Sequence, residues 1–457
     1  MSTLRSITNK TYAVYGLKNF IYNNRLQNTQ VKKNLSLIHV DTQTSKMSTQ
    51  AVDLKKIACQ AIDESTAILG QLSQEIWNNP ELAFEEHKAH ATLTKFLEKQ
   101  GFDIEHHYTS PTGFRADFGT SEHPQPHVVV ISEYDALPEI GHACGHNLIA
   151  EVGVATGIGI KAALQHALET NQQIGKVTVL GTPAEENCAG GKIDMIKHGV
   201  FNDFDFALMA HPFKITMARP LKFALDMVTV KYHGKPSHAA GFPWEGVNAL
   251  DAAVCSYNNI SCLRQQMKPN WRVHGIITNG GSKPNIIPEN TELCFYLRAP
   301  TVAELKVLSQ KATQCFQAAA MATGCEVDIE FGEKSYANMV TNSTLAGLYE
   351  ANTDEAKVAL CTDEALTKSP TGSTDFGNVS QLLPSIHPMY YIGTSVANHT
   401  REFAVASGTQ EAQDYTLRQS KCLAMTAIDV LCNPNLLVKM KEELHGQLQQ
   451  KQKQTIG

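Results

Sequence analysis

The sequence contains three short apolar runs in close succession: VVVIS at 128–132, VTVL at 177–180 and FALM at 206–209. Helix-like stretches separate these runs, at 146–166 and 191–198. Short apolar strands that alternate with helices are typical of βαβ units, whose parallel strands are buried on both faces. The pattern therefore predicts an α/β domain with a mostly parallel sheet and helices on both faces of that sheet.

Each of these runs leads into polar groups. The first is followed by Glu133 and Asp135, the second by Glu185 and Glu186, and the third by His211. Ligands gather at the carboxyl ends of the strands in such sheets. We therefore expect these groups at one edge of the sheet, where a metal ion would offset the cost of burying two adjacent acids.

Further candidate ligands lie in two loops. The segment GHACGHN at 141–147 places a thiolate and an imidazole two residues apart, at Cys144 and His146, and such a pair can bind one metal ion. His399 follows the apolar run at 389–392. Cys, His and Glu together form a mixed ligand set for zinc or manganese. A cysteine nucleophile with a histidine base, as in thiol proteases, is the alternative use of Cys144.

Residues 222–332 have a different order of predicted strands and helices. They read as strand, helix, strand, strand, helix and strand, which is a compact split βαβ pattern. This order predicts a small inserted α+β, ferredoxin-like domain. The flanking segments, 51–221 and 333–440, are then two parts of one catalytic domain, and 441–457 is expected to be a frayed polar tail.

Composition narrows the class of protein. A chain of 457 residues is too long for one compact core. The formal net charge of -6 argues against a general nucleic-acid binder, and no apolar run approaches the roughly 20 residues that span a bilayer. Eleven cysteines without a repeated spacing favour reduced thiols inside the cell. We expect a small-molecule enzyme with no nucleic-acid or membrane partner.

The first residues differ from the rest of the chain. They carry six basic side chains, and no acid occurs before Asp41: Arg5, Lys10, Lys18, Arg25, Lys32 and Lys33. That composition is typical of a mitochondrial transit peptide, whereas the alternative is a disordered extension before a start at Met47. Residues 1–50 are therefore expected to be a disordered or targeting extension. We expect a cytoplasmic location, or a mitochondrial one if this segment is a transit peptide.

The sequence resembles the metallopeptidase family that includes aminoacylase, carnosinase and carboxypeptidase G, and in particular its amidohydrolase branch. The resemblance extends from about residue 55 to residue 432 and rests on motifs in a fixed order: WNNPEL (77–82), EYDALP (133–138), HACGHN (142–147), EE (185–186), GKPSHAAGFP (234–243) and GSTDFG (372–377). It implies a zinc-peptidase-like catalytic domain with one or two divalent ions, zinc or manganese. It also implies a homodimer formed through the inserted domain, which acts as a dimerisation and lid domain.

The resemblance also implies roles for individual residues. The metal ligands would be Cys144, His146, Glu186, His211 and His399. Glu185 would be the general base, with Asp135 as a further catalytic residue, and His238 would reach across a dimer into the partner's site. Asn285 and Arg298 would contact the substrate, since a guanidinium fork can grip a carboxylate with two hydrogen bonds. Asn147 and Glu133 depart from the family's pattern, which often has an acid and an aspartate at these positions.

The function expected is metal-dependent amide hydrolysis. Within the family, the likeness is strongest to dipeptidases that cleave dipeptides with a C-terminal Lys, Orn or Arg, such as β-alanyl-lysine. Aminobenzoyl-glutamate and N-acyl amino acids are the alternative substrates. A non-catalytic interaction or regulatory protein on the same fold is the alternative of another class, and it would be expected to have lost metal ligands.

Overall fold

This computed structural model describes residues 50–119 and 126–455, with side chains described as far as residue 450. The chain divides into two units, Met1–Leu54 and Lys55–Gly457. The first unit lies almost entirely outside the described residues, as does the expected disordered or targeting extension over residues 1–50. The elements below belong to the second unit.

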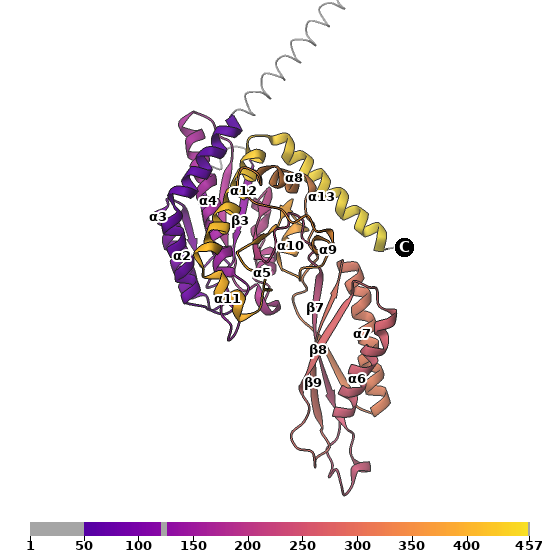
Figure 1. The fold of residues 1–457 in the computed structure, drawn as a ribbon. Helices are drawn as coiled ribbons and strands as arrows, with labels where there is room; N and C mark the ends of the chain where they lie inside the picture. The colour runs from indigo at the N-terminus through magenta and orange to yellow at the C-terminus, as the bar shows by residue number, and fades with distance from the viewer. Residues whose placement is uncertain (1–49, 120–125, 456–457) are drawn as a thin grey trace, which may run out of the picture. The chain divides into compact units, whose positions relative to one another are not determined.

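A six-stranded sheet with the order β1-β2-β4-β3-β5-β11 organises the larger part of this unit (Figure 1). Its strands are β1 (Asp103–His106), β2 (Phe114–Phe118), β3 (His127–Ser132), β4 (Lys176–Gly181), β5 (Phe206–Leu208) and β11 (Ser385–Ile386). The four strands β4, β3, β5 and β11 are parallel, whereas β1 and β2 are antiparallel to each other and β2 is antiparallel to β4. The sheet is therefore mixed.

The three apolar runs of the sequence form β3, β4 and β5, so the prediction of an α/β fold is confirmed. The antiparallel pair β1 and β2 was not predicted. β1 has the sequence DIEH and is mostly exposed. An edge strand of this kind lacks the continuous apolar run that identifies a buried parallel strand, and its charges discourage pairing with other chains.

Helices cover both faces of the sheet. They are α2 (Thr66–Asn78), α3 (His87–Lys99), α4 (His146–Glu169), α5 (Gly191–Lys197), α10 (Phe376–Ser380) and α12 (Gln410–Leu431). α4 packs on β3 and β4, and α2 and α12 pack against α4. On the face of the sheet opposite α4, α5 and α10 share a core with Val129 and Ile131 of β3 and Leu180 of β4.

Two glycines bring α4 close to the sheet. A Cβ at Gly153 would meet the carbonyl oxygen of Ile131 at 2.6 Å, and a Cβ at Gly157 would meet Cγ2 of Val179 at 2.2 Å. Only glycine permits this approach. The packing fixes the first residue of α4, His146, against the ends of β3 and β4.

α4 is also the one described helix that is by itself long and apolar enough to span a membrane, with a mean hydropathy of 1.3. Within that apolar window, 89% of the residues are buried inside the protein. Packing against the sheet and its neighbouring helices therefore accounts for its composition.

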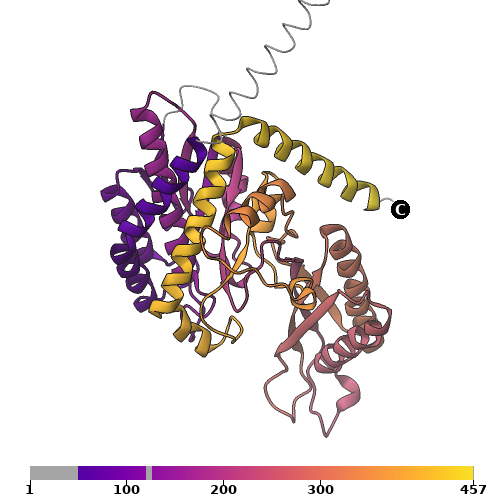
Figure 2. The ribbon, with the colours of Figure 1, turned by 45° about the horizontal axis from the view of Figure 1, so that its top comes forward.

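The region between residues 222 and 332 forms a second, four-stranded sheet with the order β10-β7-β9-β8, and every neighbouring pair is antiparallel. Its elements are β7 (Ala224–His233), α6 (Ala249–Leu263), β8 (Arg272–Asn279), β9 (Asn290–Ala299), α7 (Val302–Thr323) and β10 (Glu326–Phe331). α6 and α7 lie together on one face of this sheet (Figures 1 and 2). The order of elements matches the predicted ferredoxin-like pattern. The exact domain boundaries remain a prediction.

The chain then returns to the larger sheet. The remaining elements are α8 (Ser343–Asn352), α9 (Glu364–Thr367), β12 (Met389–Tyr391), α11 (Arg401–Ser407) and α13 (Pro434–Thr455), and β12 pairs in parallel with β6 (His211–Phe213). The segment expected to be a frayed polar tail, 441–457, is helical as far as Thr455. Its Gln, Lys and Glu residues are good helix formers, and the Glu443 carboxylate accepts hydrogen bonds from the first backbone N–H groups of α8.

Candidate metal centre

Six polar side chains converge from the start of α4, the loop after β4, the start of β6 and the loop after β12. They are Cys144, His146, Glu185, Glu186, His211 and His399. Their candidate ligand atoms lie within 4.8 Å of one another in three overlapping groups: Cys144 with His146 and His211, Cys144 with Glu186 and His399, and His146 with Glu185 and Glu186. The structure thus brings together the whole ligand set and the base that were expected from the sequence.

The turn before α4 positions two of these groups. Gly145 separates Cys144 from His146 and has a φ of 83°, a left-handed conformation that glycine adopts without strain. A Cβ at this position would also meet Cγ of Pro212 at 2.5 Å. A glycine is therefore needed for the thiol and the imidazole to share one site.

Asp135 orients the imidazole of His146. Its Oδ1 accepts a hydrogen bond from Nδ1 of His146 at 3.0 Å, and its Oδ2 accepts one from the backbone N–H of Glu186 at 2.9 Å. A carboxylate on one ring nitrogen fixes the tautomer, so that the other nitrogen is free to bind a metal. Burial opposes ionisation of Asp135, but these contacts hold its pKa below the usual range. Asp135 therefore positions a ligand and joins no ligand group itself.

Among the candidate ligands, Nε2 of His146 and Oε1 of Glu186 are buried polar atoms that lack hydrogen-bond partners in the described residues. They lie 3.8 Å apart, and the same carboxylate oxygen lies 3.5 Å from Nε2 of His399. Buried polar atoms are rarely left unpaired. Here a cation between them would satisfy both. The sulfur, nitrogen and oxygen donors together fit a divalent metal ion.

The electrostatics of the acids and the thiol agree with this interpretation. Burial raises the pKa of Glu186 to about 8, and the neighbouring charge of Glu185 adds to the shift. Burial also raises the pKa of Glu185, helped by the charges of Glu133 and Asp375. The pKa of the Cys144 thiol rises to about 12 because the thiol is buried. A thiol nucleophile needs a lowered pKa, so these surroundings favour a ligand that ionises when a cation binds.

The two remaining imidazoles, those of His211 and His399, lie in surroundings that favour the neutral form, which can bind a metal ion. Burial lowers the pKa of both His211 and His399. Nδ1 of His211 donates to the carbonyl of Pro212 at 2.8 Å, which leaves Nε2 facing Sγ of Cys144 at 3.5 Å. His399 has a φ of 65°, and its backbone N–H donates to the carbonyl of Ala143 at 2.8 Å. The strained loop is therefore held against the turn that carries Cys144.

These groups open into a cavity of about 450 Å³. This volume is within the usual range for a small-molecule site. Arg298, at the end of β9 in the smaller sheet, lines the same cavity, and its Nη1 donates to Oγ of Ser373 at 2.8 Å. The predicted substrate-binding arginine therefore lies beside the ligand groups.

His238 and Asn285 do not line this cavity. Both side chains are exposed, and the two residues belong to adjoining loops, where the Ala239 N–H donates to the Asn285 carbonyl at 3.1 Å. Nδ1 of His238 accepts a hydrogen bond from the backbone N–H of Gly241 at 3.0 Å. Within one chain, neither predicted residue reaches the metal centre, and their roles remain predictions.

Several residues of the site were missed from the sequence. Lys222 is buried, lines the cavity and donates to the Thr371 carbonyl at 3.3 Å. Tyr336 donates its hydroxyl to the carbonyl of Glu185 at 2.6 Å and accepts from the Gly190 N–H at 3.1 Å, so it fixes the loop that carries the two acids. A single lysine or tyrosine far along the chain gives no local signal of such a role.

Glu133 forms a buried ion pair beside the ligand groups, and its Oε2 lies 3.9 Å from Nε2 of His146. Its carboxylate contacts Nζ of Lys192, which also lies 2.6 Å from Oδ1 of Asp375. All three side chains are buried. Asp375 belongs to the GSTDFG motif, so the sequence contained a signal for one member of this network. The network fixes α5 and the loop before α10 beside Glu185.

Comparison with known proteins agrees with this geometry. The model of the family described as "Peptidase family M20/M25/M40" matches residues 129–412. The chain belongs to this family. Xaa-Arg dipeptidase from Mus musculus is 52% identical over 407 residues, and the match covers 87% of this chain and 94% of the relative. Xaa-Arg dipeptidase from Homo sapiens is 50% identical over 410 residues, with the same coverage of both chains.

The fold agrees as well. A solved dinuclear metal-binding peptidase of the M20 family from Bacillus subtilis matches with a TM-score of 0.61 at 19% identity, over 81% of this chain and 99% of that one. Membership of the M20 family confirms the predicted metallopeptidase resemblance and the fold class. It also places this chain among the peptidases, and the ligand groups described above are what a divalent metal would require.

Proposed function

We propose that this chain is a metal-dependent dipeptidase that cleaves dipeptides with a C-terminal Lys, Orn or Arg. The observation that carries the proposal is the complete set of five metal-ligand positions with an adjacent glutamate, at the edge of a substrate-sized cavity. The two relatives at about half identity, both named Xaa-Arg dipeptidase, support this choice of substrate. A non-catalytic protein on this fold would not need to retain every ligand.

The cofactor we propose is one or two zinc or manganese ions held by the five ligands. Such an ion lowers the pKa of a water molecule towards about 7 and polarises the scissile carbonyl. A thiolate and imidazoles suit zinc, and a carboxylate suits manganese. The Cys144 thiol belongs to two of the three ligand groups, and it would therefore bridge if two ions bind.

Glu185 is the proposed proton carrier. Its carboxylate lies with His146 and Glu186, but it does not share a ligand group with Cys144. The Tyr336 hydroxyl holds its backbone, and burial raises its pKa towards the neutral range, where a general base works best. Glu185 would take a proton from the attacking water and then pass it to the departing amine.

Arg298 is the proposed anchor for the substrate carboxylate. Its guanidinium is partly buried in the cavity and has no carboxylate partner among the described residues. Lys222 adds a second positive charge to the same wall. A dipeptide held by its terminal carboxylate would have its peptide bond directed at the metal ligands and Glu185.

We also propose a homodimer that pairs the smaller sheets. β8 is an edge strand whose Ile276 is 63% exposed, and the loop beside His238 exposes Trp244 by 76%. An exposed edge strand and exposed aromatic side chains are typical of a surface that pairs with another chain. In the dimer, His238 would enter the partner's cavity and stabilise the negative charge on the tetrahedral oxygen.

A substrate panel tests the proposed activity. The purified chain is incubated with β-alanyl-lysine, Xaa-Arg dipeptides, aminobenzoyl-glutamate and N-acyl amino acids, each with zinc, manganese or cobalt, and the released amine is measured. We expect fastest release from the basic dipeptides and none from the Glu185→Gln variant. Faster cleavage of aminobenzoyl-glutamate would contradict the proposed specificity while leaving the amide hydrolase intact.

Subunit mixing tests the proposed dimer. A His238→Ala chain and a Glu185→Gln chain are each expected to be inactive. After subunit exchange, hybrid dimers contain one site with both functional residues, so part of the activity should return. No recovery, despite exchange demonstrated by mass spectrometry of differently tagged chains, would exclude a role for His238 in the partner's site.

A cytoplasmic location is proposed for the protein, with import into mitochondria as the alternative if residues 1–46 act as a transit peptide. Fractionation of cells that express the chain from Met1 or from Met47 separates the two. Mitochondrial enrichment of only the longer form would establish the transit peptide.

A further inference from the structure

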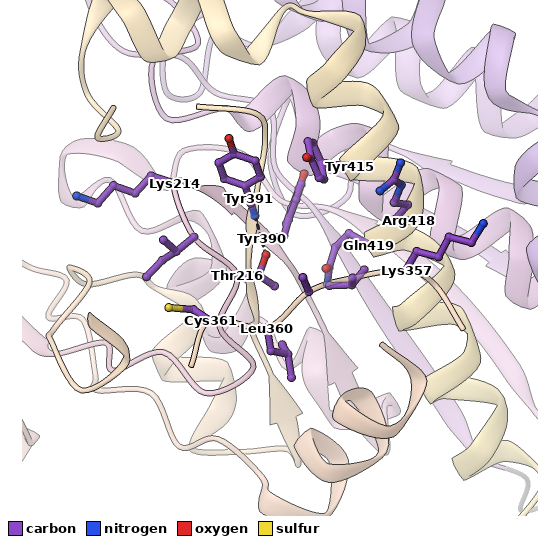
Figure 3. A pocket seen from close by; sticks show the side chains of 13 residues that line it. Lys214, Thr216, Lys357, Leu360, Cys361, Tyr390, Tyr391, Tyr415, Arg418 and Gln419 are labelled. Carbon is purple, nitrogen blue, oxygen red and sulfur yellow. Dashed lines mark hydrogen bonds between the residues drawn. The ribbon is translucent and has the colours of Figure 1, made fainter. Parts of the chain in front are cut away.

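A second cavity, of about 430 Å³, borders the two-stranded sheet formed by β6 and β12 (Figure 3). The same small sheet contributes to the catalytic cavity, which His211, Phe213 and Met389 line. The second cavity is lined instead by residues such as Tyr390 and Tyr391. The two cavities therefore share a wall, and that wall carries a metal ligand.

The lining of the second cavity is positively charged. Lys214, Lys357 and Arg418 all belong to it, and none of its lining residues is an aspartate or a glutamate. Figure 3 shows Lys214 on one side and the other two cations on the opposite side. Within the described part of the chain, no acid pairs with any of these three. Other surface cations do find partners, as Arg219 does with Glu350 at 2.8 Å.

Aromatic rings form one end of the second cavity. Tyr391 and Tyr415 pack edge to face, with ring centroids 5.0 Å apart and planes at 75°. The guanidinium carbon of Arg418 lies 5.4 Å from the centroid of the Tyr415 ring. Flat rings beside a guanidinium provide a surface for a planar apolar group whose charge is negative.

A buried donor in the lining is left without a partner. Gln419 is fully buried, and its Oε1 accepts a hydrogen bond from the Tyr349 hydroxyl at 2.9 Å. Its Nε2 donates to none of the described residues. An unpaired buried amide is costly, and this one belongs to a residue of the cavity lining.

We propose that the second cavity binds a small anion with a planar apolar body, and that this binding is coupled to the metal centre. The cations would pair with a phosphate or carboxylate, and the tyrosines would contact the planar part. The volume lies within the range of small-molecule sites. A nucleoside monophosphate and an aromatic carboxylate share this chemistry.

The coupling follows from the hydrogen bonds across the shared wall. The backbone N–H of His211 donates to the Pro388 carbonyl at 3.0 Å, and the N–H of Tyr391 donates to Oγ1 of Thr216 at 3.1 Å. Thr216 also accepts from the N–H of Cys361, in the loop that carries Lys357, at 2.9 Å. A ligand that shifts this loop or β12 would move His211 and so change the affinity for the metal. By linkage, metal binding would change the affinity for the ligand by the same factor.

Calorimetric titration of the metal-loaded full chain tests the site. The probes are AMP, 2-naphthoate and inorganic phosphate, so that the first two distinguish a phosphate from a carboxylate as the anionic group. We expect one of the organic anions to bind with a stoichiometry of one per chain and at least about tenfold more tightly than phosphate. Equal or weaker binding of both organic anions would overturn the proposal.

Matched variants locate the binding. Arg418→Gln and Lys214→Gln should each weaken the binding of the probe about tenfold, as the loss of a charge-assisted hydrogen bond does. Lys306→Gln removes the same charge from an exposed position of α7 and should have no effect. If Arg298→Gln weakens binding and Arg418→Gln does not, the anion occupies the catalytic cavity and the proposal fails.

A measurement on the unaltered chain tests the site without relying on the folding of any variant. Cys361 lines the second cavity and is partly exposed. The bound probe should slow its alkylation by iodoacetamide relative to that of Cys262, which is exposed elsewhere, and unchanged rates would contradict the proposed site. The probe should also change the dissociation constant of the metal at least about threefold. An unchanged constant would refute the coupling.

Discussion

The metal centre and the loop beside His238 show two different ways of building a site. The candidate ligands lie after β4, at the start of β6, at the start of α4 and after β12, and a buried hydrogen bond from His146 to Asp135 orients one of them. His238 and Asn285 are exposed residues of two adjoining loops beside the smaller sheet, and each accepts a hydrogen bond from neighbouring backbone. One chain therefore brings all the candidate metal ligands together, whereas His238 and Asn285 lie outside the cavity of their own chain.

The largest expected effect separates the two adjacent glutamates of the metal centre. Glu185→Gln should lower kcat by about 10²–10⁴ because a general base is lost. Metal content should stay near that of the unaltered chain, since no ligand is removed. Glu186→Gln is the matched variant, and it should lose metal as well as activity. Activity assays combined with elemental analysis check both, and an active Glu185→Gln chain would falsify the assignment of the base.

The next effect concerns the thiol. Cys144→Ser should weaken metal binding, because serine is a poor replacement for a thiolate ligand. Cys188→Ser, in the same cavity but outside every ligand group, is the control and should bind metal normally. Metal titration with a competing chelator measures both. If the Cys144→Ser chain binds metal normally and yet is inactive, the thiol-nucleophile alternative is restored.

The third effect, on KM, concerns Arg298 and tests whether the four-stranded sheet contributes to the site within one chain. Arg298→Gln should raise KM about 10- to 100-fold, as expected for the loss of a charged hydrogen bond to a substrate carboxylate. Arg272 lies opposite Arg298 in the register of β8 and β9 but does not line the cavity, so Arg272→Gln should leave KM unchanged. Equal KM values in the two variants would remove Arg298 from the substrate site.

The smallest effect is on thermal stability and on its dependence on pH. Glu151 is buried in α4, and burial raises its pKa to about 8 from an ordinary value of 4.5. The folded chain therefore holds a proton that the unfolded chain releases, so Glu151 lowers stability progressively as pH rises from about 4.5 to about 8. Glu151→Gln should raise Tm by a few degrees at pH 8 and hardly at all at pH 4.

The control for this prediction is Glu98→Gln, on the exposed side of α3. It makes the same chemical change without relieving a buried charge. Thermal unfolding of the metal-free chains at several pH values measures both variants. A pH-independent change in Tm for Glu151→Gln would show that lost packing, and not ionisation, determines the effect.

Much of the fold could be predicted because its elements have strong local patterns. The runs at 128–132, 177–180 and 206–209 are apolar throughout, as buried parallel strands are. The edge strand β1 could not be found in this way, because its polar residues face solvent. Residues 441–457 were expected to be a frayed tail, although this segment continues α13, which contacts α8.

The candidate site was predictable to the extent that it follows strand ends. Glu185 and Glu186 come directly after β4, and Asp135 follows β3. Lys222 and Tyr336 were missed, because no local pattern indicates that their segments approach the cavity. Their contacts join residues far apart in the chain: Tyr336 with Glu185 at a separation of 151, and Lys222 with Thr371 at a separation of 149.

The α/β and ferredoxin-like patterns, the ligand types and the family could be predicted before folding, because they depend on periodicity and on motifs of neighbouring residues. The ion pair of Glu133 with Lys192, the orientation of His146 by Asp135, and the wall of β6 and β12 shared by two cavities were found only in the folded chain. Such relations depend on which distant segments pack together. Burial then sets the charges and hydrogen bonds that each side chain can maintain.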